Sequence, residues 1–117
     1  MKDAKVLVVE DDPRFIEDLR DAFGMSNIFL SGIAQTLKDA LTAIESTDFN
    51  VAVLDNRLGS VDAAAKLVAA LKKHRPHAIR IGWSSTQPYP GQVDFDLGKQ
   101  VTAYHLSGFI SDLPDRQ

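Results

Sequence analysis

The stretch "VLVVEDDPRF", residues 6–15, joins four aliphatic residues directly to three acids and a proline. A continuous aliphatic run of this kind is typical of a strand that is buried on both faces of a parallel sheet. Behind it, Pro13 suits the first position of a helix and Asp12 suits its N-cap. The stretch therefore predicts a buried strand followed by a helix, with Glu10 and Asp11 at the carboxyl end of the strand.

The same alternation of apolar runs and helical patterns continues along the chain. Further strands are predicted at "NIFLSG" (27–32), "VAVLD" (51–55), "AIRIGW" (78–83) and "GFIS" (108–111). Helices are predicted between them, the second capped by Thr36, the third capped by Ser60, and a weaker fourth carrying Leu97, Val101 and Tyr104. This order favours right-handed crossovers and a parallel sheet covered by helices on both faces.

Length and composition favour one soluble domain spanning residues 1–117, with 44% hydrophobic and 25% charged residues. The formal net charge of -3 argues against a nucleic-acid surface, because "KKHR" at 72–75 is the one short basic cluster. The chain has no cysteine, which fits a reducing compartment, and it has no apolar run of membrane-spanning length. We therefore expect a cytoplasmic protein that contacts neither membrane nor nucleic acid.

Acidic residues follow two of the predicted strands. Glu10 and Asp11 end the first strand, and Asp55 ends the third. In open parallel sheets the functional groups gather at the carboxyl ends of the strands, so these carboxylates converge if the two strands are neighbours. Converging carboxylates repel unless a cation neutralises them, and an all-oxygen ligand set suits Mg²⁺. An aspartate beside Mg²⁺ can act as a nucleophile toward phosphorus.

These motifs resemble the receiver domain of bacterial two-component response regulators. "VLVVEDDP" is similar to that family's first-strand acidic motif, "VAVLDNRLG" to its phosphoacceptor strand and loop, and "GWSS" to the end of its fourth strand. The resemblance runs from Lys5 to about Asp112. It implies a flavodoxin-like (CheY-like) three-layer α/β sandwich with a five-stranded parallel sheet of order 2-1-3-4-5.

Transferred position by position, the resemblance implies a set of site residues. Glu10 and Asp11 become the metal-binding acid pair, and Asp55 becomes the phosphoacceptor, which is also a metal ligand. Arg57 would give its backbone carbonyl to Mg²⁺, Ser84 would hydrogen-bond the phosphoryl group, and Phe109 would be the aromatic switch residue. Taken alone, Ser85 or Thr86 suits the role of Ser84 equally well, and Phe109 is as well explained as a core residue.

Two departures from the family pattern are expected. The family has a lysine at the end of its fifth strand, and the corresponding stretch here is "GFISDLP", so Asp112 is predicted in place of that lysine. The negative charge of an aspartate there would repel a phosphoryl group. Only five residues follow Asp112, so the final helix is predicted to be missing or truncated. We then expect either that the chain was cut from a longer protein or that a partner or second copy covers that edge.

The resemblance implies a switch rather than a turnover enzyme. Its implied partners are a histidine kinase or phosphotransfer protein and a downstream effector protein or domain, and it leaves a homodimer open. The alternative is a degenerate, phosphorylation-independent receiver that serves as a protein–protein interaction module. A phosphatase of the haloacid-dehalogenase type fails, because Arg57 stands where a second acid is needed. A flavodoxin is disfavoured by acids in the first loop, where phosphate needs hydroxyls and amides.

Overall fold

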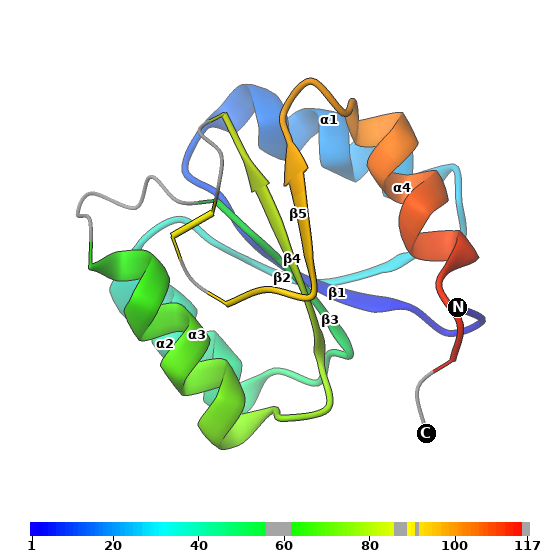
Figure 1. Ribbon diagram of the computed structural model, residues 1–117. Coiled ribbons are helices and arrows are strands. Elements are labelled where there is room, and N and C mark those ends of the chain that lie inside the picture. The colour runs from blue at the N-terminus through cyan, green and yellow to red at the C-terminus, as the bar shows by residue number, and fades with distance from the viewer. Residues whose placement is uncertain (56–61, 86–88, 91, 116–117) are drawn as a thin grey trace.

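The protein is a five-stranded parallel sheet between two layers of helices (Figure 1). The structure, a computed structural model, describes residues 1–55, 62–85, 89–90 and 92–115. The sheet order is β2-β1-β3-β4-β5, and every neighbouring pair of strands is parallel. The elements are, in chain order, β1 (Lys5–Val9), α1 (Pro13–Gly24), β2 (Phe29–Ala34), α2 (Leu37–Ser46), β3 (Val51–Leu54), α3 (Ala63–His74), β4 (Ile79–Ser84), β5 (Phe95–Gly98) and α4 (Ala103–Asp112).

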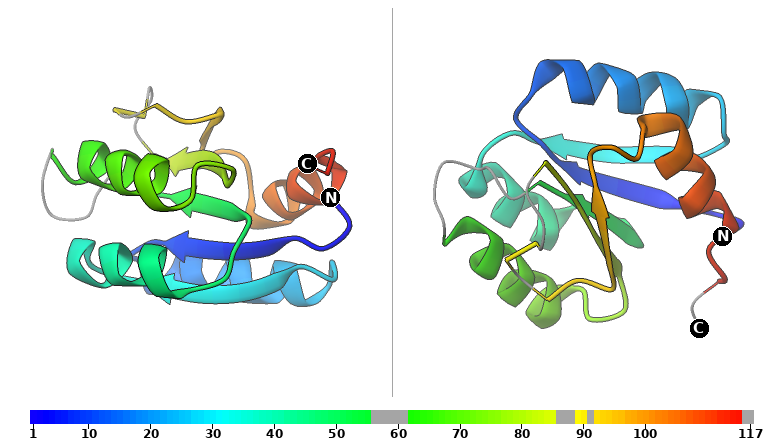
Figure 2. Two further views of the ribbon diagram at one scale, coloured as in Figure 1. Left: turned by 90° about the horizontal axis from the view of Figure 1, so that it is seen from below. Right: turned by 45° about the horizontal axis from the view of Figure 1, so that its top comes forward.

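Helices lie on both sides of the sheet (Figure 2), and a hydrophobic core fills the space on each face. Alternate strand residues enter different cores, as the pleat of a strand requires: Val6 and Val8 face α1 and α4, whereas Leu7 and Val9 face α2 and α3. Every residue from 6 to 9 is almost fully buried. The continuous aliphatic run is therefore the sequence of a strand with helices on both sides, as predicted.

The predicted caps of the first two helices are confirmed. The side chain of Asp12 accepts a hydrogen bond from Arg14 N at 2.9 Å, and Pro13 occupies the first turn of α1. Thr36 Oγ1 accepts from Asp39 N at 3.1 Å at the start of α2. Each bond satisfies a backbone donor that has no partner within its helix. Ser60, predicted to cap the third helix, lies outside the described residues.

The last two elements differ from the prediction. The strand predicted at 108–111 is part of α4, and the segment predicted to be a weak fourth helix contains the strand β5 instead. Thr102 caps α4 by accepting a hydrogen bond from His105 N at 3.2 Å. Leu106 and Ile110 are then buried at helical spacing. The apolar "GFIS" was too short to separate a strand from one turn of a buried helix by its period.

These assignments move the missing helix to another place. The final helix, predicted to be missing or truncated, is present as the ten-residue α4, which lies beside α1 over one face of the sheet. Instead, β4 is followed by β5 without a helix among the described residues between them. The predicted sheet order of 2-1-3-4-5 is confirmed, with four helices in the described part of the chain. The part of the sheet that was expected to need a partner therefore has one face covered by the chain's own α4.

Candidate functional site

The residues that follow the strands are fixed by extensions of the sheet hydrogen bonds. Glu10 N donates to Ala34 O at 3.0 Å, and Asp55 N donates to Val9 O at 2.9 Å. Because β1 lies between β2 and β3, these bonds hold the backbones of both acids at one rim of the sheet. The convergence predicted from the order of the strands follows from this registry.

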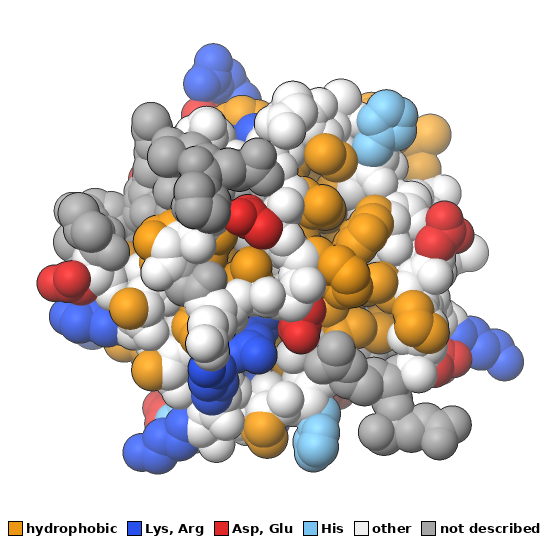
Figure 3. Space-filling model, in the orientation of Figure 1, with side chains coloured by type: hydrophobic (Ala, Val, Ile, Leu, Met, Phe, Trp, Pro, Cys, Tyr) orange, Lys and Arg blue, Asp and Glu red, His pale blue; other side chains and the backbone are white. Residues whose placement is uncertain are grey.

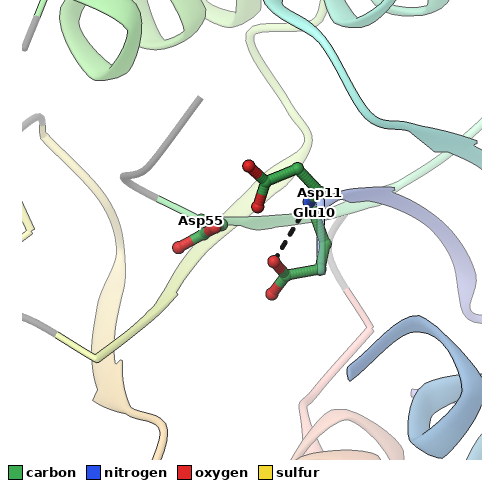
Figure 4. Close-up of side chains that lie close together, drawn as sticks. All are labelled: Glu10, Asp11 and Asp55. Carbon is green, nitrogen blue, oxygen red and sulfur yellow. Dashed lines mark hydrogen bonds between the residues drawn. The ribbon is translucent and has the colours of Figure 1, made fainter. Parts of the chain in front are cut away.

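Three carboxylates meet at this rim (Figure 4). Glu10, Asp11 and Asp55 each offer an oxygen, and these oxygens all lie within 4.8 Å of one another. Glu10 and Asp55 are buried, at 1% and 3% relative exposure, whereas Asp11 is exposed. The group therefore has a buried side that is closed to solvent and an open side formed by Asp11.

The buried carboxyl of Glu10 is held by the backbone of the turn that follows it. Its Oε2 accepts hydrogen bonds from Asp11 N at 3.1 Å and from Asp12 N at 3.2 Å. Burial, opposed by Lys99 and reinforced by the negative charge of Asp55, raises the pKa of Glu10 to about 7. Two buried acids at this spacing therefore favour the binding of positive charge.

A lysine from the far edge of the sheet supplies such a charge. Lys99 directly follows β5, and its backbone N donates to Ser84 O at 3.0 Å. Its Nζ lies 2.6 Å from Glu10 Oε1 and 3.6 Å from Asp55 Oδ1. The side chain is only 9% exposed, so this is a buried ion pair and not a solvated one.

Two aromatic rings line the path of Lys99 to the acids. Its Nζ lies 4.0 Å from the ring centroid of Phe15 on α1 and 5.5 Å from that of Trp83 on β4. The two rings meet edge-to-face at 5.3 Å, and Trp83 Nε1 donates to Val101 O at 2.9 Å. The rings thus hold the ammonium group by cation–π attraction and exclude water from its stem.

The structure corrects two of the predicted site residues. Asp112 is the last residue of α4 and does not end the fifth strand, so it does not stand in place of the family's lysine; Lys99 follows that strand. Phe109 also lies on α4, where its ring packs edge-to-face at 5.0 Å against Phe95. Phe109 was chosen because it stands three residues before Asp112. The residue three before Lys99 is Asp96, which is not aromatic. Both errors follow from placing the last strand at 108–111.

Lys99 was not predicted as a site residue, because its sequence pattern was interpreted as part of the weak fourth helix. A usable signal was present, since Thr102 precedes Ala103, Leu106 and Ile110, a capped helical pattern that begins after the lysine. A helix starting at 103 leaves "FDLGK" as a short strand with the lysine at its end. The Gly98 that weakened the helix prediction is then the last residue of β5.

Of the two remaining predicted residues, Ser84 lies within the described part of the chain and Arg57 does not. Ser84 is the last residue of β4, is fully buried, and pairs in the sheet with Gly98, next to Lys99. It therefore lies at the same rim as the acids. Arg57, predicted to offer a backbone carbonyl to a metal, lies outside the described residues.

The acid cluster fits a hard divalent cation. Within the described part of the chain, Asp55 Oδ1 is buried without a hydrogen-bond partner, since the Nζ of Lys99 lies 3.6 Å from it. A buried carboxylate oxygen of this kind calls for a proton or cation. All three donors are carboxylate oxygens, the ligand type that Mg²⁺ and Ca²⁺ prefer. The exposed Asp11 leaves room for the water ligands that Mg²⁺ retains.

Comparison with known proteins matches the fold to receiver domains. No family model matches the chain, and no curated protein matches it. A CheY-like response regulator receiver domain from Methanospirillum hungatei JF-1 is 22% identical, with a TM-score of 0.81, covering 95% of this chain and 93% of its own. The signal receiver domain of NarL from Mycobacterium tuberculosis is 23% identical, with a TM-score of 0.77, covering 96% of both chains.

A third similar structure carries ligands. It is a response regulator from Burkholderia pseudomallei with a phosphorylated aspartic acid, a calcium ion and citrate, 19% identical to this chain with a TM-score of 0.76. The match covers 89% of this chain and 64% of that one. At these identities the likeness establishes that the chain has the CheY-like receiver fold. Among the described residues, no helix has the length and apolar character needed to cross a membrane.

Proposed function

We propose that this chain is a receiver domain that accepts a phosphoryl group on Asp55 and switches a protein-interaction surface. The proposal is carried by one observation: Glu10, Asp11 and Asp55 converge within 4.8 Å at the carboxyl rim of the sheet, with the ammonium of Lys99 beside them. A nucleophilic carboxylate, acids for a metal and a cation for the product are the parts that acyl phosphate formation needs.

In the proposed step, Asp55 attacks the phosphorus of a phosphohistidine on a histidine kinase or phosphotransfer protein. A new P–O bond forms to the carboxylate as the P–N bond breaks, and the electron pair of that bond stays on the imidazole nitrogen. The buried backbone bond from Asp55 N to Val9 O fixes the position of the nucleophile. This fixed position reduces the entropy that must be lost to reach the transition state.

The metal expected here is Mg²⁺, held by Glu10, Asp11 and Asp55 with the backbone carbonyl of Arg57. When bound, it would neutralise the charge that develops on the phosphoryl oxygens. The side chains of this chain do the rest of the work. Lys99 is directed to the same carboxylates and offers the phosphoryl group a positive charge, while Ser84, at the adjacent strand end, offers it a hydroxyl.

The degenerate receiver is not favoured. Its two supports were an aspartate in place of the lysine and a missing final helix, whereas Lys99 follows β5 and α4 covers the sheet. As in other receiver-type switches, we expect a lasting chemical mark rather than repeated turnover of a substrate.

The surface that a downstream effector would contact lies over β5 and α4. Figure 3 shows hydrophobic side chains gathered on this part of the molecule. Tyr104 and Phe95 are 57% and 36% exposed, and Phe95 is supported from below by its edge-to-face contact with Phe109. Exposed aromatic residues on a rigid base are typical of protein interaction sites. We expect an effector protein or domain at this surface and leave a homodimer open.

Incubation with acetyl phosphate and Mg²⁺ tests the proposal. Intact-mass spectrometry is expected to show one phosphoryl addition per chain, and the addition is expected to disappear in Asp55→Asn or when the metal is removed by a chelator. Asp48→Asn is the matched control, because Asp48 is an exposed acid whose ion pair with Lys5 is remote from the rim. No addition to the wild-type chain, or addition that survives Asp55→Asn, would rule out the assignment.

A further inference from the structure

The segment between β4 and β5 brings a tyrosine into the core on the α2 and α3 side of the sheet. Tyr89 is only 5% exposed and belongs to the same hydrophobic cluster as Leu54, Leu67 and Leu71. In this part of the described chain no helix separates β4 from β5, so a side chain of the connecting segment itself covers the strands. The tyrosine ring thus fills core space next to the carboxyl rim.

The position of Tyr89 is fixed from two sides. A Cβ atom added to Gly82 would lie 3.0 Å from both Cβ and Cγ of Tyr89, so the ring rests directly on the backbone of β4. The amide N of Tyr89 donates to Asp96 Oδ2 at 2.8 Å, which ties it to β5. Gly82 pairs with Leu54, the residue immediately before Asp55. The ring therefore rests on the β4 residue that pairs with Leu54, and the next residue of the chain after Leu54 is Asp55, the proposed phosphoacceptor.

The hydroxyl at the end of this ring is unsatisfied. Within the described part of the chain, Tyr89 Oη is buried without a hydrogen-bond partner. Leaving such a group unpaired in the protein interior is unfavourable. Burial, together with the negative charge of Asp55, raises the pKa of Tyr89, so the phenol keeps its proton. It is therefore a buried donor without an acceptor, and Asp55 Oδ1 also has no hydrogen-bond partner among the described residues.

We propose that Tyr89 is a phosphoryl-binding residue, whose hydroxyl donates a hydrogen bond to the phosphoryl group carried by Asp55. The inference rests on the proposed function and extends it by assigning a second donor, on the opposite face of the sheet from Lys99. A phosphoryl group adds three strong acceptor oxygens and reaches beyond the carboxylate that carries it. The unpaired donor of Tyr89 is satisfied once those acceptor oxygens are present.

Tyr89→Phe separates this role from packing, because it removes the hydroxyl and keeps the ring on Gly82. The probe is beryllium fluoride with Mg²⁺, a phosphoryl mimic, with its affinity measured by calorimetry. A hydrogen bond to a charged group is worth about 1.5–3 kcal/mol, so the variant is expected to bind the mimic about 10-fold to 100-fold more weakly. Without the mimic, thermal stability is expected to be equal or higher, because the substitution removes an unpaired buried hydroxyl.

Ser46→Ala is the control, since it removes an exposed hydroxyl at the C-terminal end of α2, and this variant is expected to bind the mimic as the wild type does. Equal affinity in Tyr89→Phe and wild type would overturn the inference and leave the proposed function standing. A loss of stability in Tyr89→Phe without the mimic would also overturn it, by showing that the hydroxyl already has a structural partner. Failure of the wild type to bind the mimic would overturn both proposals.

Discussion

The two faces of the sheet near Asp55 carry different polar groups: a charged lysine on one face and a neutral tyrosine on the other. From the α1 and α4 side, Lys99 passes between Phe15 and Trp83 and pairs with buried carboxylates. From the α2 and α3 side, Tyr89 is held on β4 with a hydroxyl that has no partner in the described part of the chain. One face therefore presents a charge that is already paired, and the other presents a neutral donor that is not.

The difference shows how a site can combine stability with responsiveness. The charge of Lys99 is needed in the unmodified protein, because two buried acids without a cation would be strongly unfavourable. The free-energy cost of burying an unpaired neutral hydroxyl is far smaller than that of burying an unpaired charge. A hydroxyl can therefore stay unpaired in the resting protein until an acceptor is added. Loss of Lys99 is thus expected to destabilise the resting fold, whereas loss of the Tyr89 hydroxyl is expected to leave the resting fold equally or more stable and to weaken only the modified state.

The largest effect is expected from Lys99→Met, which keeps the length of the side chain and removes its charge. Glu10 and Asp55 then lose their cation in a buried setting, and breaking such a pair costs about 3–5 kcal/mol. The free energy of unfolding, measured by urea denaturation at pH 8 without divalent metal, checks this value. Lys73→Met on the exposed side of α3 is the control and is expected to change it by less than about 0.5 kcal/mol. Equal stability of both variants would mean that the ion pair contributes nothing.

The second effect is a pH dependence centred on Glu10. Its pKa is raised to about 7 in the folded protein from an ordinary value of 4.5, so the folded state binds the proton more tightly. This contribution to stability is full below pH 4.5 and is lost as pH rises through about 7. Between pH 5 and 8, without metal, the wild type is expected to lose roughly 1–3 kcal/mol more than Glu10→Gln. Parallel pH profiles for the two proteins would show that Glu10 ionises normally.

A smaller effect is expected on the tyrosine side from Gly82→Ala. The added methyl group would lie 3.0 Å from Tyr89 Cβ and Cγ, so the ring must shift, at a cost of about 1–3 kcal/mol. Gly108→Ala is the control, because no atom lies within 4 Å of its added Cβ and alanine favours the helix by roughly 0.5–1 kcal/mol. The midpoint temperature of thermal unfolding is expected to fall in Gly82→Ala and to rise in Gly108→Ala. A stabilised Gly82→Ala would show that Tyr89 is not seated on β4.

The smallest effect is expected from Phe15→Leu, which tests the aromatic wall beside Lys99. The ring centroid of Phe15 lies 4.0 Å from Lys99 Nζ, and a cation–π contact of this kind is worth about 0.5–2 kcal/mol. In a double-mutant cycle with Lys99→Met, the loss from Phe15→Leu is expected to shrink once the charge is gone. Phe29→Leu, at a 65% exposed position on β2, is expected to give no such coupling. Additive effects of Phe15→Leu and Lys99→Met would show that the Phe15 ring contributes by packing and not by attraction to the charge.

The early part of the chain was predictable because several signals agreed there. The aliphatic run before Glu10, the cap at Asp12 and the proline at 13 all indicated one strand followed by one helix, and the structure has both. The proximity of Glu10, Asp11 and Asp55 followed from strand order alone. Near the C-terminal end the signals conflicted: a four-residue β5 carries a weak pattern, and "GFIS" suits a strand or a helix turn.

The sequence by itself determined a parallel sheet with acids at one rim, because local periodicity and the end of each strand are properties of neighbouring residues. Only the tertiary structure decided which lysine and which aromatic residues meet those acids. Lys99 reaches the acids from the end of β5, and the ring of Tyr89 rests on β4. Both residues are far from Glu10 in the chain, and their placement depends on which segment forms the last strand. That choice is made by the packing of α4 against α1 and of Tyr89 against Gly82, contacts that no local pattern encodes.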